Sequence, residues 1–159
     1  MTGLAVIGLR IAIVFMFLGA VAAQLWFIPQ FARDCVDEWP ELSFLAVPYT
    51  VLWILVAVCV QVVFVALWVL LSKVRRGAIF SESAFGWVNA IIAAGAVATL
   101  LVFGLEVHLL GIVDVGGPPL GILLTGICTA GGAFVLIMVV MRSLLRSATN
   151  LQSELEEVV

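Results

Sequence analysis

Charged side chains are scarce in this sequence. Only seven Lys and Arg and ten Asp and Glu occur among its 159 residues, whereas 65% of the residues are hydrophobic. Soluble domains carry about 25% charged residues, so the composition excludes a soluble globular domain. The sequence also lacks the runs of Lys and Arg that bind nucleic acid. We therefore expect membrane lipids as surroundings and no nucleic-acid partner.

Residues for catalysis and for cofactor binding are equally sparse. His108 is the only histidine, so one chain cannot supply both axial histidines of a membrane b-type haem. No C-x-x-C, P-loop or H-E-x-x-H motif is present. Two of the three cysteines, Cys59 and Cys128, fall inside hydrophobic runs, where cysteine acts as a small packing residue. The sequence thus predicts no enzyme, no metal site and no cofactor.

Long hydrophobic runs are what the sequence does contain. Four of them, at about residues 4–27, 48–71, 87–110 and 119–141, reach the roughly 20 apolar residues needed to cross a bilayer. Backbone groups in lipid must be satisfied within the segment, and these runs lack the polar alternation of barrel strands. The sequence predicts one all-α domain, a polytopic membrane protein with a bundle of four transmembrane helices.

The first run has a second interpretation. Arg10, the apolar residues after it and the sequence Ala20-Val21-Ala22 are similar to a secretory signal with its cleavage site. However, the apolar residues continue through Phe27, which gives a full membrane span. We expect the first segment to be retained as a helix that ends near Phe27, because Pro29 disfavours helical geometry in the residue before it.

The distribution of charge predicts the orientation in the membrane. The connection at 28–47 is acidic, and most of the Lys and Arg lie in the connection at 72–86 or after residue 141. Basic residues near span ends mark the cytoplasmic side. We therefore expect a plasma (inner) membrane protein whose N- and C-termini are both cytoplasmic. The cytoplasmic basic loop is formed by Lys73, Arg75 and Arg76.

Residues 142–159 differ from the spans in carrying a single apolar stripe. Its members recur at spacings of four, three, four and three, as on one face of a helix. This pattern predicts a cytoplasmic amphipathic extension of the fourth helix that contacts a partner. It is too short to establish a coiled coil. The stripe consists of Leu144, Ala148, Leu151, Leu155 and Val158.

Small residues recur every four positions in the third and fourth spans. Such faces allow helix backbones to approach closely in lipid. They predict packing between the third and fourth spans, and the alternative is a face for a second copy of the chain. The packing residues that we expect are Ala90, Ala94, Ala98, Gly126, Ala130 and Gly132.

Three ionisable residues lie near the end of the third span. Glu106, His108 and Asp114 are candidates for a proton- or cation-linked role, because ionisable groups in spans are often functional. Their structural alternatives are contact with headgroup water, with Arg33 or with a neighbouring helix. On one helix, Glu106 and His108 would face about 200° apart and could not share one small site. The other polar residues at lipid depth are Gln24 and Gln61. Each of them predicts an interhelical hydrogen bond.

Two segments resemble a known family. Residues 71–81 contain R-R-G-A-I-F and are followed by Asn89, and residues 145–159 read L-R-x-x-x-x-L-x-x-E-L-E-x-V-V. Both are similar to the bacterial four-helix membrane proteins of domain of unknown function 2975, especially the actinobacterial members. The chain departs from that pattern where Ala90-Ile91-Ile92 replaces the basic cluster that often follows the asparagine. The resemblance implies the four-helix topology, and the frequent encoding of members beside helix-turn-helix regulators implies a regulatory role.

Two functions remain open from the sequence. The first is a non-enzymatic accessory or regulatory subunit that binds protein partners, or a second copy of itself, through its helix faces and its tail. The second is a small transporter or channel in which Glu106 or His108 acts on a proton or cation. Together with the acidic connection at 28–47, His108 and Asp114 could instead bind a divalent cation, although no ligand spacing is distinctive.

Overall fold

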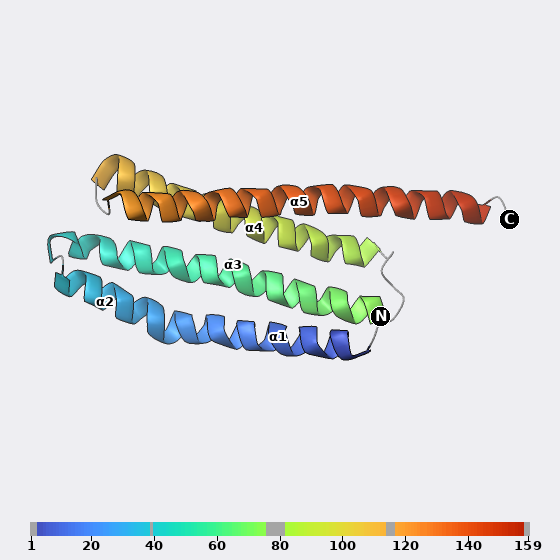
Figure 1. The fold of residues 1–159 in the computed structure, drawn as a ribbon, viewed down its shortest axis with the longest axis horizontal. Coiled ribbons are helices and arrows are strands. Elements are labelled where there is room, and N and C mark those ends of the chain that lie inside the picture. The colour runs from blue at the N-terminus through green and yellow to red at the C-terminus, as the bar shows by residue number, and fades with distance from the viewer. Residues whose placement is uncertain (1–2, 39, 76–81, 114–116, 158–159) are drawn as a thin grey trace.

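The computed structural model describes residues 3–38, 40–75, 82–113 and 117–157 (Figure 1). Every described residue is helical, which confirms the all-α fold. The elements, in chain order, are α1 (Gly3–Ala22), η1 (Ala23–Phe27), α2 (Ile28–Glu38), η2 (Pro40–Leu42), α3 (Ser43–Arg75), α4 (Glu82–His108), η3 (Leu109–Val113) and α5 (Gly117–Glu157).

Four helical runs are long and apolar enough to cross a membrane, as the sequence predicts. They cover Val6–Asp37, Ser43–Lys73, Ala84–Val113 and Gly117–Thr149 and contain 30 to 33 residues each. At about 1.5 Å per residue, each is about 45–50 Å long, whereas the hydrocarbon core is about 30 Å thick. The ends of the helices therefore extend to the headgroups and beyond.

The first helical run is longer than expected. Residues 23–27 form a π-helical turn, in which the Ile28 N–H donates to the carbonyl of Ala23 five residues earlier, and α2 follows at once. The wider turn repositions the carbonyls that the ring of Pro29 would meet in a regular α-helix. Pro29 therefore does not end the helix at Phe27.

The second span also begins earlier than the sequence predicts. Helix α3 starts at Ser43, so Pro48 lies inside it rather than in its first turn. Proline has no N–H to donate to the carbonyl four residues before it, that of Phe44. That carbonyl is still in the first turns of a helix end that extends past the hydrocarbon, where water can satisfy it.

The helices pack in the order in which they occur in the chain. The extensive interhelical contacts are those of α1 and α2 with α3, of α3 with α4, and of α4 with α5. Figure 1 shows α1 and α5 at the two edges of this array. The most apolar part of the span Ala84–Val113, which includes α4, is 28% buried, compared with 6% to 11% in the other spans.

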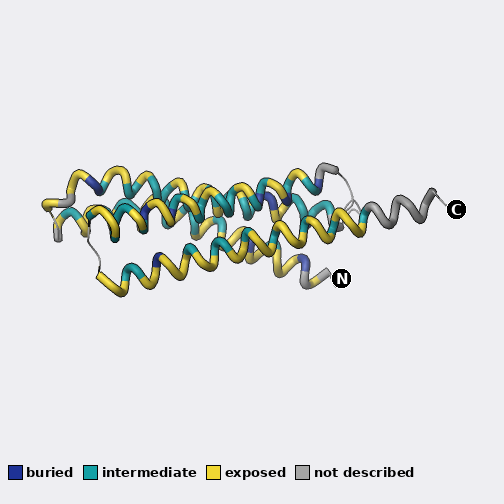
Figure 2. Tube along the Cα trace, turned by 90° about the horizontal axis from the view of Figure 1, so that it is seen from above, coloured by how far each residue is buried: buried dark blue, intermediate teal, exposed yellow. Residues whose placement is uncertain are grey.

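Most of the side chains on the outer faces are apolar and exposed (Figure 2). In a membrane these faces meet lipid chains, so their exposure has no cost. A buried cluster forms where α3, α4 and α5 meet and contains Val102, Leu105 and Leu124. Tyr49 and Trp53 of α3 pack against it. This cluster positions the polar residues near the end of α4.

Candidate functional site

Glu106 faces α5. The Thr125 hydroxyl donates a hydrogen bond of 2.5 Å to its Oε1 atom. The Cys128 thiol, about one helical turn further along α5, faces the same carboxylate. Within the described ranges, no Lys or Arg forms an ion pair with Glu106, and Arg33 lies elsewhere, on α2. Of the alternatives that the sequence leaves open, the structure shows the contact with a neighbouring helix.

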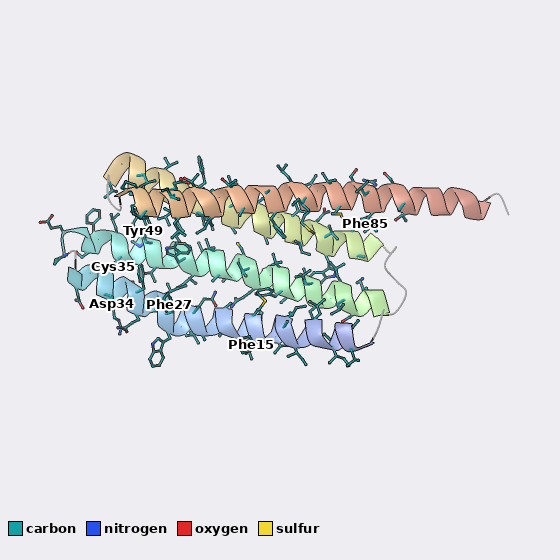
Figure 3. The ribbon with its side chains drawn as sticks, viewed as in Figure 1. Phe15, Phe27, Asp34, Cys35, Tyr49 and Phe85 are labelled. Atoms are coloured by element: carbon teal, nitrogen blue, oxygen red, sulfur yellow. The ribbon has the colours of Figure 1, made fainter. Side chains whose placement is uncertain are left out.

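His108 faces α3. Its Nδ1 atom lies 2.7 Å from the Tyr49 hydroxyl, and the two rings meet edge to face with their centroids 5.9 Å apart. Tyr49 projects from α3 beside the buried cluster (Figure 3). His108 is the last residue of α4 before the π-helical turn η3. The pair thus joins the ends of α3 and α4.

The two ionisable residues do not share one site. Glu106 contacts α5 and His108 contacts α3, as their spacing of two residues on one helix predicts. Asp114 lies outside the described residues. A proton- or cation-linked role for these three residues, including the divalent-cation site, stays a prediction.

On α5, the small residues that contact α4 differ from those that the sequence predicts. A Cβ atom added at Gly95 would lie 3.2 Å from the ring of Phe134, and one added at Gly131 would overlap the Thr99 side chain. Glycine at 131 therefore permits the closest approach of the two helices, and the contact at Gly95 is also tight. On α4, the expected residues are half-buried beside this contact, namely Ala90, Ala94 and Ala98.

On α5, the expectation of packing against α4 is wrong for Gly126 and Ala130. Both are exposed, and a Cβ atom added at Gly126 would meet nothing within 4 Å. The physical reason is helical geometry, since Gly126 lies five residues before Gly131 and therefore about 140° around the helix. Gly132 is half-buried, and a Cβ atom there would also meet nothing within 4 Å.

Gly126 and Ala130 instead belong to a shallow groove on the outer side of α5. It has a volume of about 710 Å³, and α5 alone supplies its lining. Thr125 lies at its edge and also donates to Glu106. We call this surface the α5 groove. Its residues are Gly121, Ile122, Thr125, Gly126, Thr129, Ala130 and Ala133.

Two other polar contacts join α1 and η1 to α3. Gln61 donates a 2.8 Å hydrogen bond to Gln24, which confirms the interhelical bond predicted for these glutamines. Arg10, at the other end, donates a 3.0 Å hydrogen bond to Ser72, and its guanidinium lies 5.0 Å from the centre of the Trp68 ring. The first span is therefore held to α3 by polar contacts at two levels.

The basic loop and the tail are described only in part. Lys73 is half-buried, Arg75 belongs to α3 without a described side chain, and Arg76 lies outside the described residues. In the tail, Leu144 is 60% exposed and Ala148 is exposed. Helix α5 continues through 151 and 155, although the side chains of Leu151 and Leu155 are not described. Val158 lies outside the described residues.

Sequence reasoning missed Tyr49 and Thr125. Tyr49 carries one signal, because it is the only tyrosine in the chain and lies within a hydrophobic run. Buried tyrosines usually hydrogen-bond through the hydroxyl, so a polar partner was to be expected. Thr125 carries no such signal, because threonine in a span commonly bonds a carbonyl of its own helix, as Thr129 does.

One family model matches most of the chain. The model of a family described as "Protein of unknown function (DUF2975)" matches residues 30–159, which include α3, α4 and α5. No curated protein and no solved structure matches the chain.

Proposed function

The chain belongs to the DUF2975 family of proteins of unknown function, and we propose that it acts as a non-enzymatic accessory or regulatory subunit in the plasma membrane. In this proposal its partners are other membrane proteins, or further copies of the chain, bound through helix faces and through the tail. The observation that carries the proposal is the α5 groove. It lies on the edge helix α5, which alone supplies its lining.

The composition of the groove supports a helix as its occupant. Lipid chains cover any apolar face, so exposure of apolar residues is not evidence for a protein partner. Glycine and alanine are different, because they let a second helix backbone come close enough for extensive van der Waals contact. The small residues that pack α4 are separate from those of the groove, so internal packing does not account for Gly126 or Ala130.

Glu106 adds a polar feature beside this surface. Its carboxylate accepts from Thr125, which lines the groove, and among the described residues it has no basic partner. Carboxylates in spans are costly and generally pair with another group. A partner helix in the groove can bring a hydrogen-bond donor to this level, which supports an interaction role for the residue.

The transporter alternative receives less support from the contacts. That function requires Glu106 or His108 to face a path for a proton or cation. Instead, Glu106 is engaged with α5 and His108 with α3, on opposite sides of α4. Each contact is sufficient to explain its residue as part of an interhelical hydrogen bond.

A leucine placed in the groove tests the proposal. We expect Gly126→Leu to insert and fold normally, because Gly126 is exposed and a Cβ atom added there meets nothing within 4 Å. It should reduce recovery of co-purified partners by about tenfold or more, as expected when a bulky side chain separates two packed helices. The measurement is quantitative mass spectrometry of affinity-purified protein in mild detergent, together with its detergent-corrected mass.

Gly19→Leu is the matched control for this experiment. Gly19 is also an exposed glycine in a span, with nothing within 4 Å of an added Cβ atom, but it lies on α1 at the other edge. We expect its partners and its mass to equal those of wild type. If Gly126→Leu retains the wild-type partners and mass as well, the groove is not a docking surface.

The tail is tested by a separate double substitution. We expect Leu151→Glu with Leu155→Glu to leave membrane insertion intact, because both positions lie beyond the last candidate span, which ends at Thr149. The two charges should release bound partners or change the oligomer, since they interrupt the predicted apolar stripe. An unchanged set of partners and an unchanged mass would contradict a role of the tail.

A further inference from the structure

A second cavity lies between α2 and α3, at the opposite edge of the array from the α5 groove. Its volume is about 350 Å³. Unlike the α5 groove, it is formed by two elements, so it is a cleft between helices. We call it the α2–α3 cleft. Its residues are Pro29, Ala32, Arg33, Val36 and Asp37 of α2 and Ala46, Val47, Thr50 and Val51 of α3.

Two opposite charges line this apolar cleft. Arg33 and Asp37 are four residues apart, hence on the same side of α2, and both are exposed. Within the part of the chain that the structure describes, neither forms an ion pair or a hydrogen bond. Asp34 does not line the cleft, and it accepts a 3.2 Å hydrogen bond from Gln30. The cleft thus presents one unpaired cation and one unpaired anion.

The cleft lies at the depth of lipid headgroups. The first candidate span runs from Val6 to Asp37 and has 32 residues, which is about 48 Å of helix against about 30 Å of hydrocarbon. The apolar residues end near Ile28, and the charges of α2 begin at Arg33, about 7 Å further along. Arg33 and Asp37 are therefore beyond the acyl chains, whereas Val47 and Val51 of α3 extend the cleft toward them.

We propose that the α2–α3 cleft binds a phospholipid with a phosphoethanolamine headgroup. Arg33 binds the phosphate, because a guanidinium matches phosphate oxygens with paired donors. Asp37 accepts hydrogen bonds from the primary ammonium, and the apolar wall packs along the glycerol and the first carbons of the chains. The hydroxyl of Thr50 donates to the Ala46 carbonyl at 2.6 Å, which leaves its oxygen free to accept from the same ammonium.

The charge pattern selects this headgroup over the other common ones. Phosphatidylglycerol brings an anion without a cation, so Asp37 repels it. Phosphatidylcholine brings a quaternary ammonium, which has no N–H to donate to the carboxylate. Only the primary ammonium beside a phosphate satisfies both side chains of the cleft. This inference is independent of the accessory role, because it concerns the other edge of the molecule.

Native mass spectrometry of the purified chain tests the proposal. Delipidated protein is titrated with dioleoyl phosphatidylethanolamine, phosphatidylcholine and phosphatidylglycerol in the same detergent, and the affinity of the first bound lipid is measured. We expect the first lipid to bind about fivefold more tightly for phosphatidylethanolamine than for either of the others, the ratio that one charge-assisted contact near a membrane surface carries. Asp37→Asn should reduce this ratio to about one, whereas Arg33→Gln should weaken the first binding of all three lipids, because it removes the phosphate contact that they share.

Two further variants separate the cleft from general charge effects. Asp34→Asn removes a charge of the same sign from the same helix, and its side-chain oxygen can still accept from Gln30, so the preference should be unchanged. Ala46→Leu fills the cleft and leaves every charge in place, and the preference should be lost. Circular dichroism and elution volume confirm that each variant is folded.

Several outcomes overturn the proposal. Equal binding of the three lipids by wild type excludes headgroup selection, and tighter binding of phosphatidylglycerol assigns Arg33 to a simple anion site. A loss of preference in Asp34→Asn equal to that in Asp37→Asn assigns the effect to net charge. Displacement of bound lipid by millimolar free phosphoethanolamine would identify a soluble zwitterion, rather than a lipid, as the ligand.

Discussion

At the scale of single residues, the glutamines of the spans show how this chain tolerates polar groups in lipid. Gln24 lies in the π-helical turn and Gln61 in α3, and their side chains bond to each other. Gln24 also donates to the carbonyl of Ile54 at 3.4 Å. Each amide thereby has a partner without water. Because the bonds connect different helices, they also fix how the first span sits on α3.

The glutamine pair gives a prediction about stability. We expect Gln24→Leu and Gln61→Leu each to lower the unfolding free energy by about 1 kcal/mol. The first leaves the Gln61 amide without its acceptor, and the second leaves the Gln24 side-chain carbonyl without its donor. The double substitution should cost less than the sum, since it removes both polar groups together. Reversible unfolding in mixed micelles measures the three values. Strictly additive losses would show that the two side chains do not interact.

Residue types were predictable here, but partners were not. The sequence identifies Gln24 and Gln61 as polar groups that need an interhelical bond, and that prediction is confirmed. No pattern in the sequence indicates that Arg10 lies over Trp68 and donates to Ser72, as it does in the structure. These contacts depend on which helices are neighbours, and no local pattern contains that information.

At the scale of helices, the closest approach of α4 and α5 is set by Gly131. The Thr99 hydroxyl opposite it bonds to the carbonyl of Gly95 at 2.8 Å, so the threonine is held in one orientation. A side chain at 131 must displace that orientation or push the helices apart. Repeats every four residues are visible in the sequence, but they do not identify which repeat faces the neighbouring helix.

Substitution at this contact has a predictable cost. We expect Gly131→Ala to lower the unfolding free energy by about 1–2 kcal/mol, as overpacking of a tight contact does. Thr99→Ala should restore most of the loss in the double variant, because it removes the atoms that the new methyl group meets. Gly126→Ala, on the exposed face of α5, is the control for replacing a helical glycine with alanine. It should not lower the unfolding free energy. If Thr99→Ala does not restore the stability of Gly131→Ala, the strain does not lie between Thr99 and the residue at 131.

Helix boundaries were less predictable than the spans themselves. Hydrophobic runs identify all four spans, because each must supply its own backbone hydrogen bonds in lipid. The ends at Pro29 and Pro48 were predicted from local rules for proline, and both rules were overridden. A π-helical turn accommodates Pro29, and Pro48 lies in a helix that begins five residues earlier, at Ser43.

At the scale of the whole molecule, the orientation in the membrane is a prediction that thiol labelling can test. We expect both termini and the loop at 73–76 to be cytoplasmic, because most Lys and Arg lie there. On a background without Cys59 and Cys128, an impermeant thiol reagent added to intact cells should label Cys35, which is exposed. A cysteine introduced at position 81, with Cys35 replaced, should react only after permeabilisation. Labelling of position 81 in intact cells would reverse the orientation.

The chain-order array has a consequence for how the protein is made. Its extensive contacts join spans that follow one another in the sequence: the first with α3, α3 with α4, and α4 with α5. No span has to wait for a distant part of the chain before it finds its neighbour, and local contacts of this kind favour rapid assembly. Each newly inserted helix can dock on the one synthesised just before it. When α5 docks on α4, its outer face with the groove is left open to other helices in the membrane.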